Sequence, residues 1–153
     1  MVSMVAVTLL VVVFAATRGD WPERLCAAII AGESLVDLVL HLTIGPRTFR
    51  MFDASRFLID VACALGFIAV AMRANRVYPL AIAAAQLVAV IGSLAVVLSD
   101  DGWSQAFWAM TQLPLLLQWL LLVGGTIAHR QRLARIGPYN CWSPRAVDGR
   151  YFA

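Results

Sequence analysis

The sequence contains no lysine, and all of its positive side-chain charge comes from twelve arginines. Without a lysine amine, a Schiff base to retinal or pyridoxal phosphate cannot form, so chemistry of that kind is excluded. The net charge is +3, and only 14% of the residues are charged. Soluble domains average roughly a quarter charged residues, so this composition lies outside that class.

Common sequence signatures of catalysis are also missing. Cys26, Cys63 and Cys141 are widely spaced and form no CxxC pair, which disfavours a disulfide framework or a zinc knuckle. The sequence has no GxSxG elbow, no HExxH pair and no Gly-rich phosphate loop. The residues therefore identify no reaction, and they favour a protein that is not an enzyme.

Apolar residues are abundant instead, making up 61% of the chain, with a mean hydropathy of +0.81. Long apolar runs separated by short polar turns predict membrane-spanning helices. We place five spans at about residues 2–17, 23–44, 57–72, 77–98 and 103–128; four remain if the short first run does not cross. The sequence thus predicts an all-α polytopic transmembrane helix bundle over residues 1–128, followed by a basic, aromatic tail over residues 129–153.

The distribution of arginines between the predicted loops indicates an orientation. Arg47, Arg50 and Arg56 fall on one side of the membrane. The other side holds a larger group, namely Arg18, Arg24, Arg73, Arg76, Arg130, Arg132, Arg135 and Arg145. Because cytoplasmic loops are enriched in basic residues, we expect a bacterial-type inner membrane protein with its N-terminus outside and its C-terminus in the cytoplasm.

The second predicted span carries three ionisable residues at a spacing of four: Glu33, Asp37 and His41. On a helix this spacing places them on one face. Ionisable side chains inside a bilayer normally face protein or a water-filled cavity. Asp60 follows near the start of the next span, at about the expected depth of His41, and consecutive helices are usually neighbours. We therefore expect these four residues to share one buried site, with Arg47 and Arg56 close enough in sequence to neutralise part of it.

The fifth predicted span has a polar stripe of its own. It repeats at helical spacing and consists of Ser104, Gln105, Trp108, Thr111, Gln112 and Gln118. Within that stripe, Gln112 is expected near the level of Glu33 or Asp37. A bundle that turns both polar faces inward would allow them to contact each other. Gln112 is therefore included among the candidate site residues.

Two classes of function fit such a site. A hydrogen-bonded network can fix helix packing, which suits a non-enzymatic accessory or assembly subunit. Carboxylates and imidazole also build proton relays and ion pathways, so a proton or cation transporter is the alternative. We favour the first interpretation, because the sequence shows no inverted repeat or pair of broken helices that would support a transport cycle.

No cofactor or metal ion is predicted. The candidate site has a single histidine and the chain has no His-rich loop, which is a poor ligand set for zinc or manganese. His41 and His129 are expected at opposite faces of the membrane, so they do not suit the two axial positions of one haem.

The basic tail predicts contacts at the membrane surface. Arg130, Arg132 and Arg135 fit anionic lipid headgroups. Tyr139 and Trp142 add aromatic side chains to these arginines, a combination that favours docking to other membrane-protein subunits. Nucleic-acid binding is disfavoured, since no soluble folded module accompanies the basic residues.

Overall fold

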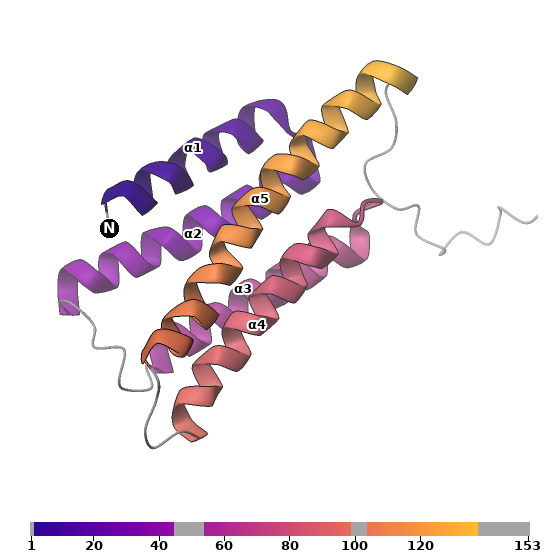
Figure 1. The fold of residues 1–153 in the computed structure, drawn as a ribbon. Helices are drawn as coiled ribbons and strands as arrows, with labels where there is room; N and C mark the ends of the chain where they lie inside the picture. The colour runs from indigo at the N-terminus through magenta and orange to yellow at the C-terminus, as the bar shows by residue number, and fades with distance from the viewer. Residues whose placement is uncertain (1, 45–53, 99–103, 138–153) are drawn as a thin grey trace, which may run out of the picture.

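The computed structural model describes residues 2–44, 54–98 and 104–137 (Figure 1). These residues form five α-helices, α1 (Val2–Arg18), α2 (Trp21–Ile44), α3 (Ala54–Arg73), α4 (Tyr78–Leu98) and α5 (Ser104–Ile136). The last four each contain a stretch long and apolar enough to cross a membrane, whereas α1 is a shorter apolar helix. The prediction of an all-α polytopic bundle is confirmed, with four long candidate spans and one shorter helix.

Successive helices run in opposite directions and pack side by side (Figure 1). Each helix packs against the next in sequence, and α5 also contacts α1 and α2. One end of the bundle therefore gathers the C-terminal ends of α1, α3 and α5 with the N-terminal ends of α2 and α4. We call it the basic end, because its described residues include Arg18, Arg24, Arg73, Arg76, Arg130, Arg132 and Arg135.

Side-chain caps, including the Glu23 half of a capping box, start α2 at Trp21, two residues before the predicted boundary. The Asp20 carboxylate accepts a hydrogen bond from the Trp21 amide at 2.9 Å, and the Asp20 amide donates to Glu23 Oε2 at 3.0 Å. This arrangement satisfies amides that the first turn of a helix leaves without partners. It also holds Glu23, which is fully buried, in a fixed position at the basic end.

The fifth helix continues to Ile136, eight residues beyond the predicted end at residue 128. Arginine, glutamine, leucine and alanine all favour helix, so the basic sequence extends the helix although it is too polar for the bilayer core. Gly137 ends it with a φ of 78°, and its amide donates to the Leu133 carbonyl at 3.0 Å. The first part of the predicted tail is therefore helical, while Tyr139 and Trp142 lie outside the described residues.

The apolar core takes residues from all four long helices. Ile30, Phe67, Ile82 and Leu122, from α2, α3, α4 and α5 respectively, have no exposed surface. Many large apolar side chains on the outer surface are exposed, as expected where lipid is the solvent. Lipid is as apolar as these side chains, so van der Waals packing and polar contacts between helices must contribute much of the stability.

Two glycines bring α5 close to α4. A Cβ atom built at Gly125 would lie 2.7 Å from the ring of Tyr78, and one built at Gly92 would lie 3.0 Å from the Cβ of Met110. A Cβ atom at Gly125 would therefore collide with the Tyr78 ring, and one at Gly92 would fit only if Met110 shifted slightly. This close approach places the middle of α5 next to polar groups on α4, which become part of the site below.

Candidate functional site

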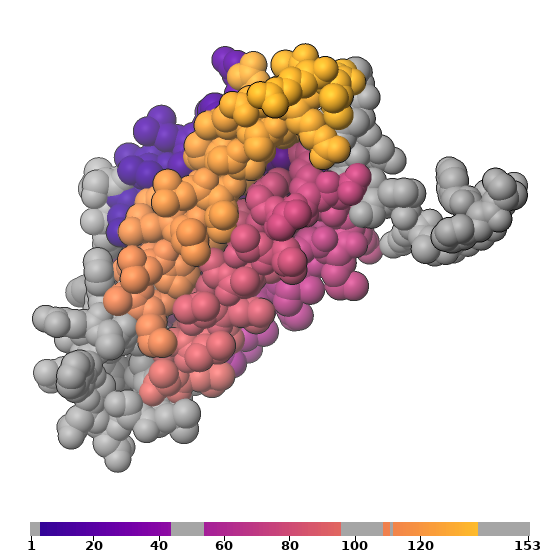
Figure 2. Space-filling model, turned by 45° about the vertical axis from the view of Figure 1, so that its right-hand side comes forward, coloured from indigo at the N-terminus to yellow at the C-terminus, as the bar shows by residue number. Residues whose placement is uncertain are grey.

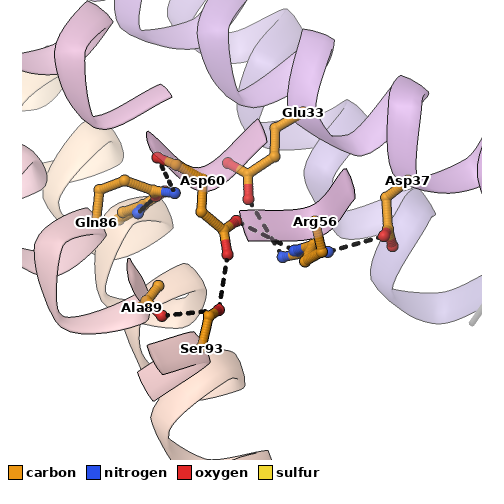
Figure 3. A network of polar contacts seen from close by, with 8 residues as sticks. Glu33, Asp37, Arg56, Asp60, Gln86, Ala89 and Ser93 are labelled. Atoms are coloured by element: carbon orange, nitrogen blue, oxygen red, sulfur yellow. Dashed lines mark hydrogen bonds and ion pairs between the residues drawn. The ribbon is translucent and has the colours of Figure 1, made fainter. Parts of the chain in front are cut away.

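The candidate site is centred on Arg56, in the first turn of α3, which contacts three carboxyl groups (Figure 3). Its Nη1 donates to Asp37 Oδ1 at 2.8 Å, and its Nη2 donates to Glu33 Oε1 at 3.3 Å. Its Nε donates to Asp60 Oδ1 at 3.1 Å, one helical turn further along α3. We call these four residues the Arg56 cluster. It joins α2 to α3 through charge-assisted hydrogen bonds, which are about twice as strong as neutral ones.

Asp60 extends the contacts from α3 to α4. Ser93 Oγ donates to Asp60 Oδ2 at 3.1 Å, and it also lies 3.2 Å from the Ala89 carbonyl of its own helix (Figure 3). Gln86 Nε2 donates to the main-chain carbonyl of Asp60 at 3.4 Å. One carboxyl group of α3 is thus held by an arginine on one side and by a hydroxyl on the other.

Gln86 in turn connects α4 to α5. Gln118 Nε2 donates to Gln86 Oε1 at 2.5 Å, and both amide side chains are almost fully buried. A continuous polar path therefore crosses the bundle from Asp37 on α2, through Arg56 and Asp60, to Gln118 on α5. All four long helices contribute to this path.

The path passes from a partly exposed edge into the interior. The exposed fraction of the side chain is 45% for Asp37 and 28% for Arg56, but 9% for Glu33 and 1% for Asp60. Opposite charges attract most strongly where water is excluded, so the pairs that Arg56 makes with Glu33 and Asp60 dominate the electrostatics. The pair with Asp37, closer to the surface, is more strongly screened.

The structure brings three of the five predicted site residues together, namely Glu33, Asp37 and Asp60. Among the residues that the structure describes, no hydrogen bond or ion pair joins His41 or Gln112 to the Arg56 cluster; both side chains are partly exposed. Asp60 lies deeper than expected, because α3 begins at Ala54 rather than Phe57. It is the seventh residue of the helix, about 9 Å along the axis, whereas His41 lies in the last turn of α2.

Sequence reasoning did not include Ser93, Gln86 or Gln118 among the site residues. Ser93 is expected from sequence to be only a small packing residue, yet its hydroxyl binds a buried carboxylate. A usable signal was present: Gln86 and Ser93 are seven residues apart in an apolar helix, which places them on one face. Two polar groups on one face of a membrane helix indicate a polar neighbour.

A second polar group of residues lies at the basic end. Arg76, in the turn between α3 and α4, pairs with Glu23 Oε1 and lies 3.7 Å from Asp20 Oδ2. Its Nη2 also lies 2.9 Å from His129 Nδ1 on α5. A guanidinium only donates, so this geometry makes Nδ1 an acceptor and leaves the ring proton on Nε2. We call Asp20, Glu23, Arg76 and His129 the Arg76 cluster; it joins α2 and α5 to the α3–α4 turn.

The predicted tail arginines, Arg130, Arg132 and Arg135, are exposed on the last two turns of α5. Their position at the basic end is compatible with contact to a membrane surface. Comparison with protein-family models, with curated proteins and with solved structures finds no match for this chain. The geometry of the two clusters is therefore the feature of this chain that bears on its function.

The polar side chains of both clusters form ion pairs and hydrogen bonds with one another. Within the described part of the chain, no group of three histidine, cysteine, aspartate or glutamate side chains is arranged to hold a metal ion. The carboxyl groups of Glu33, Asp37 and Asp60 converge instead on the guanidinium of Arg56. Such an arrangement holds helices together and balances buried charge.

Proposed function

We propose that this protein is a non-enzymatic accessory or assembly subunit of a membrane complex, with the Arg56 cluster holding its own helices in register. The observation that carries the proposal is that Arg56 donates to three carboxylates from two helices. An arginine that lies at the centre of the acids occupies the position that a bound cation would need. Buried ion pairs between helices can specify one arrangement of those helices.

The second cluster supports the same interpretation. Arg76 joins Glu23 of α2 to His129 of α5, so polar contacts fix the helices near both ends of the bundle. A rigid bundle with an exposed apolar surface can present a constant face to another membrane protein. The partner contact proposed here includes Tyr139 and Trp142 of the tail. Arg130 and Arg135 would contact anionic headgroups on the cytoplasmic side, which is the orientation that the arginine distribution favours.

Purification from the native membrane tests the proposal. Because a subunit is held by its complex, the tagged full-length protein extracted in a mild detergent should bring down a membrane partner at constant stoichiometry. Deleting residues 138–153 should lower partner recovery at least several-fold, since aromatic residues commonly dominate interfaces. Quantitative mass spectrometry of the eluate measures both effects.

The matched control is a chain of full length in which Tyr139 and Trp142 are replaced by serine. Loss of the partner in this variant would place the contact on the aromatic side chains rather than on tail length. If the wild-type protein is repeatedly recovered alone from membranes at native expression levels, the accessory role is rejected.

A proton or cation transporter remains the second candidate, and one observation favours it. Glu33 Oε1 accepts from Arg56, but Glu33 Oε2 is buried and has no hydrogen-bond partner among the described residues. A buried carboxyl oxygen without a partner is unfavourable unless a proton or a water molecule satisfies it. Glu33 is therefore the residue of the cluster best placed to exchange a proton.

Flux measurements separate the two candidates. If the protein is an accessory subunit, proteoliposomes containing it should show no proton flux above protein-free vesicles when a pH gradient is imposed. A flux that Glu33→Gln and Asp37→Asn abolish, in variants that retain the helical circular dichroism of the wild type, would establish the transport function. A flux that both variants retain would point to leakage rather than to this site.

A further inference from the structure

A groove runs along α5 at the basic end, and its lining includes Arg76 and His129 of the Arg76 cluster. Its volume is about 490 Å³, and its walls come from the α3–α4 turn and from one face of α5. The apolar part is lined by Leu120, Leu121 and Gly124, and the polar part by Asn75 and Arg132. A second groove of about 360 Å³ continues along the same helix past Arg132 to Arg135. Figure 2 shows this end of α5, in yellow, beside the pink residues that begin α4.

The open floor of the groove comes from a glycine that no packing requires. A Cβ atom at Gly124 would meet nothing within 4 Å, in contrast to the adjacent Gly125, which lies directly against the Tyr78 ring. Gly124 therefore leaves space on the surface of α5 rather than allowing two helices to touch. Leu120, one turn earlier on the same face, is strongly exposed and extends this apolar surface towards the middle of the bundle.

Positively charged arginine side chains lie at one end of this apolar surface. Arg132 and Arg135 line the grooves beyond the last turn of the apolar part, and Arg76 lies in the wall next to Asn75. This end coincides with the α3–α4 turn, where the chain leaves the span and the membrane interface must lie. The groove has apolar walls and a basic opening at the membrane interface. It therefore complements a molecule that has an acyl chain in the bilayer and a negatively charged headgroup at the interface. Basic pockets between membrane helices bind phospholipid headgroups in this way.

We propose that this groove is a binding site for one anionic phospholipid. The phosphate lies between Asn75 and Arg132, and an acyl chain follows Leu121, Gly124 and Leu120 down α5. Arg132 lines both grooves, whereas Arg73 and Arg130 of the basic end line neither. It does not depend on the accessory role, because lipid would occupy it whether or not a partner protein binds elsewhere.

The experiment uses the full-length protein, purified in detergent and titrated with phosphatidylglycerol or with phosphatidylcholine as the uncharged comparison. Native mass spectrometry measures the apparent Kd of the first bound lipid. Arg132→Gln should weaken phosphatidylglycerol binding about fivefold, equivalent to about 1 kcal/mol for one arginine near the surface. Arg73→Gln is the matched control: it removes the same charge from the basic end, but Arg73 lines neither groove. It should leave the Kd within about twofold of the wild type.

A second variant tests the apolar half independently. Gly124→Leu has open space for its side chain, so the fold should persist, and the added atoms should displace the acyl chain and weaken binding of phosphatidylglycerol. The proposal is overturned if phosphatidylglycerol binds no more tightly than phosphatidylcholine, or if Arg73→Gln and Arg132→Gln weaken binding equally. It is also overturned if Gly124→Leu binds like the wild type. Recovery of a dimer that Gly124→Leu dissociates would assign the groove to a second protein chain instead.

Discussion

Replacing Arg56 with methionine should lower the free energy of unfolding by about 3–5 kcal/mol, the range for removing one partner of a buried ion pair. Methionine retains much of the volume but none of the five donors of arginine. Glu33 and Asp60, both buried, would then lose the guanidinium that each contacts at 3.3 Å and 3.1 Å. Equilibrium unfolding in mixed detergent micelles, followed by circular dichroism, measures the change.

A rescue experiment separates lost charge balance from lost packing. Adding Glu33→Gln, Asp37→Asn and Asp60→Asn to the Arg56→Met background removes the uncompensated acids at nearly constant volume. Because a buried pair replaced as a whole is often close to neutral, the fourfold variant should recover most of the lost stability. If it is as unstable as Arg56→Met alone, the contribution of Arg56 is packing, and the electrostatic account of the cluster fails.

Replacing Arg76 with glutamine should also destabilise the protein by about 3–5 kcal/mol. Glu23 is fully buried, and its Oε1 is paired with Arg76, so the change leaves a carboxylate in the interior without its counter-ion. It also removes the donor to His129 Nδ1, which lies 2.9 Å away. Contacts of the α3–α4 turn with both α2 and α5 would weaken together. Equilibrium unfolding in mixed detergent micelles would measure the resulting loss of stability.

The neighbouring Arg73 provides the control for this variant. Its side chain is exposed at the end of α3, so Arg73→Gln should change the free energy of unfolding by no more than about 0.5 kcal/mol. Equal decreases in the free energy of unfolding for Arg73→Gln and Arg76→Gln would show that the basic end needs positive charge in general. In that case the specific pair between Arg76 and Glu23 would not be a determinant of stability.

The helices were predictable from sequence because hydropathy reports directly on the environment of a span. All five predicted apolar runs correspond to helices in the structure. The boundaries differ where local chemistry overrides hydropathy: the side-chain caps of Asp20 and Glu23 start α2 earlier, and Gly137 ends α5 later. Hydropathy locates the bilayer, whereas capping residues and intrinsic propensity locate the ends of a helix.

The candidate site was predictable only in part. Spacing of four places Glu33 and Asp37 on one face, and short connections make α2 and α3 neighbours, so their meeting with Asp60 follows from sequence. Gln118 belongs to the polar stripe predicted for the fifth span, but its contact with Gln86 could not be derived, because a sequence does not say which helix a polar face meets. That choice depends on the close contact of Gly125 with Tyr78, a matter of three-dimensional packing.

The division of charge between helices has a consequence for how the protein enters the membrane. α2 carries Glu33 at its middle and Asp37 one turn further on, while their arginine follows 23 and 19 residues later in the chain. An acidic residue at the centre of a lone span disfavours its insertion by about 2.5–3.5 kcal/mol. During synthesis, α2 would therefore remain at the translocon until α3, which carries Arg56, has also been synthesised. The α2–α3 hairpin is then the smallest unit that partitions into lipid with its acids accompanied by a counter-ion.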